Sequence, residues 1–373
     1  MLNRSVTSGI TSAYGRSANG QSRPRRAYRV RRNGRSTLPI VVIRIESLSV
    51  ENLRCFNGEH QLDLGENDEA SIDVISGPNS SGKTTLADSI QLCLTGEFED
   101  EALLVTYELV DQLSPGEEVS AKVSAVISDS DLDRKFRFSR EFQTSETRRG
   151  PVNSVDSLQV EEEEGGDWVS VSSSEAVNTV FPLQAFTFCK LDSDSSIGID
   201  NPWGGTSWSE LVEDVGEAAA QQSAARGVDL PDFFSNSYDL GDEMLCRVND
   251  LLDSIDGRYR VEERQDGLVG RSAENGSGGK VQSLPAGQQI LISQAAALVA
   301  GEMMIATPPL IGDSIFGRVD RNLRKDLAEV IQEMDRHVLL FVIEPELEGL
   351  DLNPRFKLER TQKDMSSQIV SLE

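Results

Sequence analysis

A glycine-rich loop at residues 77–84 constrains the fold of this chain more than any other feature. It has the order Gly-x4-Gly-Lys-Thr. Residues 71–76, directly before it, form a short apolar run typical of a buried strand, and apolar residues after it recur at helical spacing over 86–94. A strand, a glycine loop and a helix in this order predict an α/β fold with the loop at the edge of a sheet.

The composition of this loop indicates phosphate binding. Glycines let successive backbone N–H groups turn inward around an anion, and the positive end of the following helix adds to the attraction. A lysine and a threonine at these positions neutralise the β- and γ-phosphate oxygens and hold Mg²⁺, respectively. The sequence therefore predicts a site for ATP and Mg²⁺. The residues expected to bind the nucleotide are Gly77, Asn79, Ser80, Ser81, Gly82, Lys83, Thr84 and Thr85.

A magnesium ion at such a loop also needs a carboxylate at the end of a neighbouring strand. Asp313 closes an apolar run at 309–313 and is the natural candidate. An aspartate can also follow a strand as an ordinary helix cap. Its distance from the loop along the chain and its position between a strand and a helix favour the metal role. We therefore assign Lys83 and Asp313 to catalysis, and Thr84 and Asp313 to the metal.

Two α/β segments, 40–192 and 281–373, enclose the rest of the folded chain. The first contains the glycine loop and, over 118–172, alternating runs that predict an antiparallel β-subdomain. The second contains a helix at 288–300 that is apolar on nearly every side and a buried strand at 337–343. We expect these segments to form an N-terminal and a C-terminal lobe.

The middle segment, 193–280, has a different character. Residues 209–225 and 243–255 have helical patterns and are separated by Gly, Pro, Asp and Ser. No heptad pattern is sustained, so a long coiled coil is excluded. We expect a short helical insertion.

Charge is distributed unevenly along the chain. It has 36 basic and 62 acidic residues, a net charge of −26. Residues 1–44 hold ten Arg and no acidic residue, so the remainder carries 26 basic against 62 acidic residues, a net charge of −36. An acidic, lysine-poor surface suggests adaptation to high salt, where screening weakens self-repulsion. An ordinary acidic protein that avoids nucleic acid is the alternative.

The basic segment at 1–39 is rich in Arg, Ser and Gly and has no hydrophobic stretch, which excludes a secretory signal. Its composition resembles a transit peptide or a basic arm that touches phosphates. A start of translation near Val41, with the tail an artefact of start assignment, is the third interpretation. In each case we expect this tail to be disordered and to lie outside the fold.

Several other functional classes are excluded by composition. The four cysteines are widely separated and form no C-x-x-C pair, so neither a disulfide scaffold nor a zinc site is indicated. Only two histidines are present. The apolar runs are far shorter than the roughly 18 residues that a membrane span requires. We therefore expect a cytoplasmic protein without a membrane partner.

The order of the motifs resembles a known family. Residues 50–56 (Val-Glu-Asn-Leu-Arg-Cys-Phe) resemble the opening of SMC-like DNA-repair ATPases of the RecF and SbcC kind, and 284–288 (Leu-Pro-Ala-Gly-Gln) resembles the ABC signature loop. Residues 312–320 (Gly-Asp-Ser-Ile-Phe-Gly-Arg-Val-Asp) are similar to the Walker B and D-loop stretch of the DNA-sulfur-modification ATPase DndD. The resemblance implies a P-loop NTPase fold, an ABC-ATPase head, in which 193–280 replaces a long coiled coil.

The resemblance also implies partners and further site residues. Such heads dimerise face to face around two ATP molecules, and each phosphate loop meets the signature loop of the other subunit. On this basis Ala286, Gly287 and Gln288 would meet the partner's nucleotide, and Asp320 would lie at the dimer interface. Arg54 would approach the nucleotide phosphates, with a plain surface arginine as the alternative. The implied partners are a second copy or a paralogous head, DNA, and a nuclease or modification protein.

Three positions depart from the pattern of the family. Pro285 stands at the signature serine, Ser314 stands where SMC-type heads place a catalytic glutamate, and Ile343 stands at the switch histidine. At the position of the Q-loop glutamine, Lys190 and Asp192 are the nearest polar candidates. A missing general base typically lowers a rate by about 10²–10⁴-fold. The sequence therefore predicts ATP binding with slow or assisted hydrolysis.

Two other functions remain open from the sequence. The first is a degenerate head that holds ATP structurally, as the non-hydrolysing half of a heteromeric complex. The second is the nucleotide-binding subunit of a transporter, which the opening motif at 50–56 and the β-rich stretch disfavour. A role in DNA repair, DNA modification, restriction or defence follows from the resemblance alone.

Overall fold

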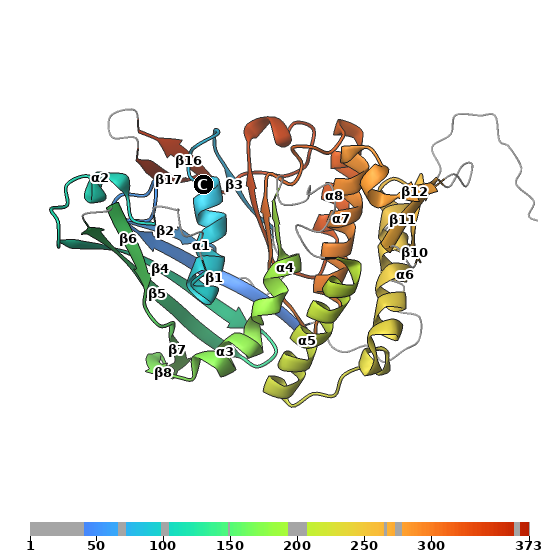
Figure 1. Cartoon of the computed structure of the whole chain (residues 1–373), viewed down its shortest axis with the longest axis horizontal. Coiled ribbons are helices and arrows are strands. Elements are labelled where there is room, and N and C mark those ends of the chain that lie inside the picture. The colour runs from blue at the N-terminus through green and yellow to red at the C-terminus, as the bar shows by residue number, and fades with distance from the viewer. Residues whose placement is uncertain are drawn as a thin grey trace, which may run out of the picture.

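The computed structural model describes residues 41–65, 72–97, 104–147, 150–192, 207–264, 267–272, 278–361 and 366–372. The basic tail predicted at 1–39 lies outside the described residues. Figure 1 shows a large antiparallel sheet at one end, a second sheet in the middle and a group of helices at the other end. Helix α1 (Lys83–Thr95) contacts strands of both sheets, so it lies in the core between them.

The first sheet has eight strands, in the order β13-β1-β4-β5-β7-β8, with β2 paired to β1 and β6 to β5. Alternating burial along β4 directs apolar side chains toward α1 and polar ones outward. The sheet confirms the β-subdomain predicted over 118–172. Its strands are β1 (Val41–Glu51), β2 (Glu59–Asp63), β4 (Glu118–Asp129), β5 (Arg134–Thr147), β6 (Gly150–Val155), β7 (Gln159–Glu164), β8 (Asp167–Ser170) and β13 (Ala306–Thr307).

The second sheet has six strands in the order β17-β16-β3-β15-β14-β9, and β16, β3, β15, β14 and β9 run parallel. All five residues of β15 are buried, as expected of a strand covered on both faces. The carboxyl ends of the parallel strands meet at one edge, where α/β folds bind ligands. The strands are β3 (Ile72–Ser76), β9 (Lys190–Asp192), β14 (Leu310–Asp313), β15 (Val338–Val342), β16 (Phe356–Arg360) and β17 (Ser367–Ser371).

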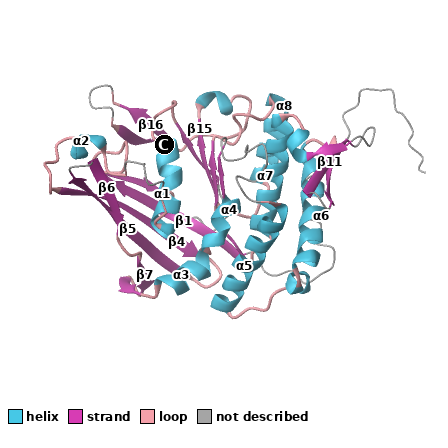
Figure 2. Ribbon diagram, viewed as in Figure 1, coloured by secondary structure: helices cyan, strands magenta, loops and turns pink. Residues whose placement is uncertain are grey.

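Helices cover the far side of the second sheet, as the cyan ribbons of Figure 2 show. The central one, α7 (Ala286–Glu302), is buried without interruption from Gln289 to Gly301 and contacts α4, α5 and α6. This confirms the buried helix predicted at 288–300. The remaining helices are α2 (Tyr107–Val110), α3 (Ser173–Val180), α4 (Phe186–Cys189), α5 (Trp208–Arg226), α6 (Ser237–Ile255) and α8 (Arg321–Gln332).

The middle segment contains the two predicted helices, α5 and α6, and also a small antiparallel sheet that the sequence did not predict. This sheet has the order β10-β11-β12, with bounds Tyr259–Arg264, Gly267–Ser272 and Gly278–Lys280. The prediction of a purely helical insertion was therefore incomplete. The strands are short and bury few side chains, and β11 and β12 contain glycines, so their alternation is weak in the sequence.

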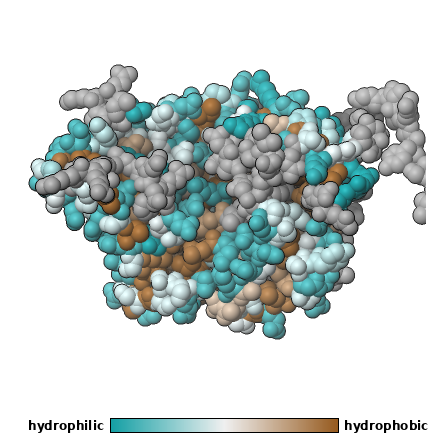
Figure 3. All heavy atoms as spheres, in the orientation of Figure 1, coloured by the Kyte–Doolittle hydropathy of each residue, from teal (hydrophilic) through white to brown (hydrophobic). Residues whose placement is uncertain are grey.

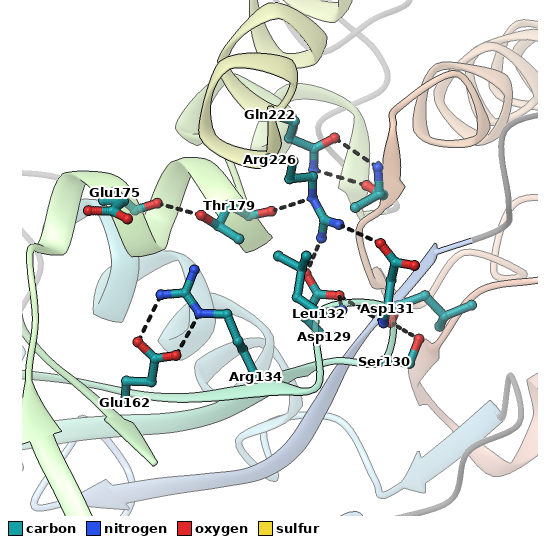
Figure 4. Close-up of polar contacts among 12 residues, drawn as sticks. Asp129, Ser130, Asp131, Leu132, Arg134, Glu162, Glu175, Thr179, Gln222 and Arg226 are labelled. Carbon is teal, nitrogen blue, oxygen red and sulfur yellow. Dashed lines mark hydrogen bonds and ion pairs between the residues drawn. The ribbon is translucent and has the colours of Figure 1, made fainter. Parts of the chain in front are cut away.

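Helix α5 is attached to the first sheet by buried polar contacts, which Figure 4 shows. The guanidinium of Arg226 pairs with the carboxylate of Asp129, and these side chains are 1% and 0% exposed. Arg226 also donates to the carbonyl of Thr179 at 3.3 Å. The amide of Gln222 donates to the carbonyl of Ala306 and accepts from its N–H, both at 3.0 Å. The side chain of Gln222 thereby satisfies backbone groups at the edge of the sheet.

A second buried cluster lies at the amino-terminal end of the second sheet. The backbone N–H of Ile45 donates to Nδ1 of His337 at 3.2 Å, and Nε2 of His337 lies 2.8 Å from the carboxylate of Asp73. Arg355 also pairs with Asp73. Burial is the main cause that lowers the pKa of His337, so the ring is neutral. The cluster ties β1, β3 and β15 together and is structural.

The face seen in Figure 3 is largely hydrophilic around its rim, and apolar side chains gather between the first sheet and the helices. Within the described residues, no helix is both long enough and apolar enough to cross a membrane.

Candidate nucleotide-binding site

The glycine loop connects β3 to α1 at the carboxyl edge of the second sheet. Gly82 precedes the helix with φ at +98°, a conformation that side chains rarely adopt, and a Cβ there would lie 2.7 Å from the ring of Phe56. A Cβ on Gly77 would lie 2.5 Å from Oγ of Ser81. Both glycines are therefore required by close packing around the loop.

Lys83 lies across the loop. Its ammonium donates to the carbonyls of Gly77 and Pro78, both at 2.9 Å. Burial lowers the pKa of Lys83, and the nearby carboxylate of Asp313 opposes this shift. The ammonium of Lys83 is thus held by two carbonyl groups of the loop.

Thr84 and Asp313 meet although they are far apart in the chain. The hydroxyl of Thr84 donates to Oδ2 of Asp313 at 2.6 Å. Thr84 lies in the first turn of α1 and Asp313 ends β14, so the topology alone brings them to the same edge. Two oxygen ligands at one point suit Mg²⁺, which otherwise takes waters and substrate phosphates. Within the described ranges, no group of three or more His, Cys, Asp or Glu side chains forms a separate metal centre.

The other predicted loop residues differ in exposure. Asn79 and Ser80 face solvent, whereas Ser81 is buried and its hydroxyl has no hydrogen-bond partner among the described residues. Thr85 is buried, and its hydroxyl lies 3.6 Å from Sγ of Cys55. The open side of the loop is therefore formed by Asn79 and Ser80.

Arg54 contacts helix α1 through a residue that the sequence analysis missed. Its guanidinium donates to Asp88 at 2.5 Å, and the ammonium of Lys190 reaches the other oxygen of Asp88 at 2.5 Å. Asp88 follows Thr84 by four residues and so lies on the same helix face, one turn away. This spacing was the signal available in the sequence. Arg54 therefore lies near the glycine loop and is paired with Asp88.

The predicted signature and D-loop residues lie next to each other. Helix α7 begins at Ala286, which is exposed, and the backbone of Gly287 packs against the carbonyl of Arg318. The side chain of Gln288 donates to the hydroxyl of Tyr259 at 2.7 Å. Asp320 is exposed at the start of α8. These residues form one surface region rather than part of the phosphate loop.

Two of the three positions that depart from the family pattern, Ser314 and Ile343, lie at the same sheet edge as the loop, whereas Pro285 precedes α7. Ser314 has φ at +56°, and its hydroxyl lies 3.5 Å from Oδ1 of Asp313. Ile343 follows β15 and is half-buried. In the pairing of β9 with β14, Asp192 is opposite Asp313. Of the two candidates for the Q-loop position, Asp192 therefore lies nearer the edge than Lys190.

Glu346 is a second residue that the sequence analysis missed. It ends a short 3-10 helix, Glu344–Glu346, directly after β15 and is 3% exposed. Burial raises the pKa of its carboxyl group to about 7, and Lys83 and Asp313 are among its electrostatic neighbours. In the sequence it is one of several acids in a loop, so no pattern marked it as buried.

Comparisons with known proteins agree with this geometry. A profile described as an AAA domain matches residues 47–186. No curated protein matches the chain. The Smc head domain of Pyrococcus furiosus, solved with an extended coiled coil and the C-terminal domain of ScpA, is similar with a TM-score of 0.57 at 12% identity, covering 89% of this chain and 97% of that one. A Smc head bound to the C-winged helix domain of ScpA has a TM-score of 0.57 at 13% identity, covering 88% and 98%.

The structural matches show that the chain has a P-loop NTPase fold. More narrowly, the chain has the fold of an SMC head, and the resemblance inferred from its motifs is confirmed at this level. Residues 207–280 contain α5, α6 and the small β10–β12 sheet within the part that is described. That the segment 193–280 replaces the coiled coil of SMC heads stays a prediction. The narrower resemblance to DndD stays a prediction.

Proposed function

We propose that this chain binds ATP and Mg²⁺, dimerises on ATP and hydrolyses it slowly. The contact between Thr84 and Asp313 beside the ammonium of Lys83 carries the proposal. Thr84 and Asp313 would hold Mg²⁺, which shields phosphate charge when bound. The loop amides and Lys83 would bind and orient the triphosphate, and positioning of this kind supplies most of the catalysis in phosphoryl transfer.

Dimerisation is supported by the exposed region that contains Ala286, Gly287 and Asp320. The N–H groups at the start of α7 suit an anion, because the positive end of a long helix faces outward there. The resemblance to SMC-like heads pairs this region with the phosphate loop of another head. A second copy of the chain or a paralogous head would supply that loop.

A role on DNA, in repair, modification, restriction or defence, rests on the resemblance. Excluding residues 1–44, the chain carries 26 basic and 62 acidic residues, so contact with DNA requires a local arginine patch or the basic tail. Salt-titrated binding of the full chain and of a chain lacking 1–39 separates these routes. Equal affinity of the two proteins would assign the contact to the folded head.

The alternative is a head that binds ATP without hydrolysing it, as a structural subunit of a heteromeric complex. Pro285, which has no N–H, Ser314 in place of a glutamate and Ile343 in place of the switch histidine favour it. Turnover distinguishes the two functions, because a non-hydrolysing head binds ATP but forms no ADP.

The experiment is calorimetry and ADP release at molar KCl with Mg²⁺, using Lys83→Ala as the control. We expect the unmodified chain to bind ATP and release ADP slowly, and the variant to do neither. Folded protein that takes up no adenine nucleotide would refute the proposed function.

A further inference from the structure

The candidate site contains a buried carboxylate to which the family pattern assigns no role. Glu346 follows β15, whose parallel neighbours are β3, leading into the phosphate loop, and β14, ending in Asp313. The carboxyl ends of these strands share one edge, so Glu346 lies between the phosphate loop and the carboxylate proposed for the metal. Its electrostatic coupling to both Lys83 and Asp313 agrees with this position.

Contacts place this carboxylate against the turn that follows Asp313. A Cβ built on Gly317 would lie 2.8 Å from Oε1 of Glu346 and 3.2 Å from the carbonyl of Ser314. Glu346 therefore packs on the turn 314–317, which begins at the residue where SMC-type heads place a catalytic glutamate. The side chain that reaches this turn comes from the 3-10 helix that follows a different strand, β15.

One oxygen of Glu346 is left without a partner. The residue is only 3% exposed, yet its Oε2 has no hydrogen bond within the part of the chain that the structure describes. Leaving a buried polar group unpaired costs roughly 1–3 kcal/mol, more when it is charged. The neighbouring Glu344 shows the ordinary arrangement, since it is exposed and lies 3.8 Å from the ammonium of Lys357. Because leaving Oε2 of Glu346 without a hydrogen bond costs free energy, this oxygen is suited to accept a hydrogen bond from the attacking water molecule.

We propose that Glu346 supplies the carboxylate that orients and deprotonates the attacking water during ATP hydrolysis, in place of the glutamate that Ser314 replaces. This inference rests on the proposed function. The water oxygen forms a bond to the γ-phosphorus, and one water proton moves to the carboxylate of Glu346. The bond from the γ-phosphorus to the β–γ bridging oxygen breaks, and its electron pair stays on ADP. The proton then passes from Glu346 to solvent.

The test is the variant Glu346→Gln, which keeps size and removes the proton acceptor, with Glu344→Gln as the matched control. ADP release is measured at saturating ATP and Mg²⁺ in molar KCl, and ATP affinity is measured by calorimetry. We expect Glu346→Gln to lower kcat by about 10²–10⁴-fold with ATP affinity within roughly threefold, since its role is in the chemical step. Glu344→Gln should retain the rate of the unmodified protein.

Size-exclusion chromatography in the presence of ATP measures how long the dimer persists. If Glu346 had only a structural role, its replacement would not lengthen the life of the dimer. Unhydrolysed ATP should make the Glu346→Gln dimer persist longer than that of the unmodified protein. Turnover by Glu346→Gln within tenfold of normal, loss of ATP affinity, or failure to fold would each overturn the inference. If the unmodified chain still hydrolyses ATP, these three results for Glu346→Gln do not contradict the proposed function. An unmodified chain that binds ATP without releasing ADP would overturn both hydrolysis and this role.

Discussion

Replacing Arg226 by methionine tests whether the ion pair with Asp129 fixes α5 to the first sheet. The two side chains are 1% and 0% exposed, so solvent does not screen them. Removing one partner of such a pair leaves an unpaired buried charge and typically costs about 3–5 kcal/mol. Asp129 keeps hydrogen bonds from the N–H groups of Asp131 and Leu132, both at 3.1 Å. These bonds partly stabilise the carboxylate, so we expect a loss near the lower limit, about 3 kcal/mol.

The assay is urea unfolding followed by tryptophan fluorescence, because urea adds no ions. Arg321→Met is the matched control, since its pair with Glu348 is 70% and 69% exposed, and such pairs typically contribute about 0–1 kcal/mol. A double variant, Arg226→Met with Asp129→Leu, should lose less stability than Arg226→Met alone, because it leaves no unpaired charge. The salt dependence of the Arg226 effect should be small.

Two results would refute this reasoning. The first is an Arg226→Met protein whose free energy of unfolding lies within about 1 kcal/mol of the unmodified protein, well below the loss typical of a broken buried pair. The second is a double variant as unstable as the sum of its single variants, which would show that the two side chains do not interact.

Three further predictions concern the loop and its surroundings. Asp313→Ala should abolish the Mg²⁺-dependent part of ATP binding in calorimetry, and equal affinity with and without Mg²⁺ in the unmodified protein would contradict the metal site. Gly82→Ala should lower the midpoint of thermal unfolding, because φ is +98° and its Cβ would lie 2.7 Å from Phe56; an unchanged midpoint would argue against this loop geometry. Glu346 has a pKa raised to about 7, so it stabilises the fold below its unfolded pKa near 4.5, and this contribution is lost as pH rises through about 7. Relative to Glu346→Gln, the unmodified protein should lose about 3 kcal/mol over this range, and parallel stability–pH curves would contradict the buried carboxyl.

The phosphate loop could be predicted from the sequence because its chemistry is local. The glycines, Lys83 and Thr84 are consecutive, and the strand and helix around them have strong apolar patterns. Asp313 could be predicted because parallel strands end at a common edge. An acid at the end of the apolar run 309–313 must therefore lie near the phosphate loop. The SMC-type fold followed from the order of motifs.

The residues that the sequence analysis missed depend on side-chain directions that no pattern specifies. Asp88 is one half-buried polar residue of α1, and only the fold shows that Arg54 and Lys190 converge on it. Glu346 is one of many acids, and its burial depends on the packing of the turn at 314–317. The β10–β12 sheet was missed because its short strands bury few side chains and so have weak periodicity. Each of these features depends on contacts between segments that are far apart in the sequence.

The short middle segment limits how far this head can extend. Helices α5 and α6 have 19 residues each, and at about 1.5 Å per residue each is about 28 Å long. In the described part of the chain both helices lie against the body of the head, and α5 is joined to the first sheet through Gln222 and Arg226. Neither can serve as a long lever that captures a distant target. A partner that contacts α5 or α6 therefore does so at the surface of the head.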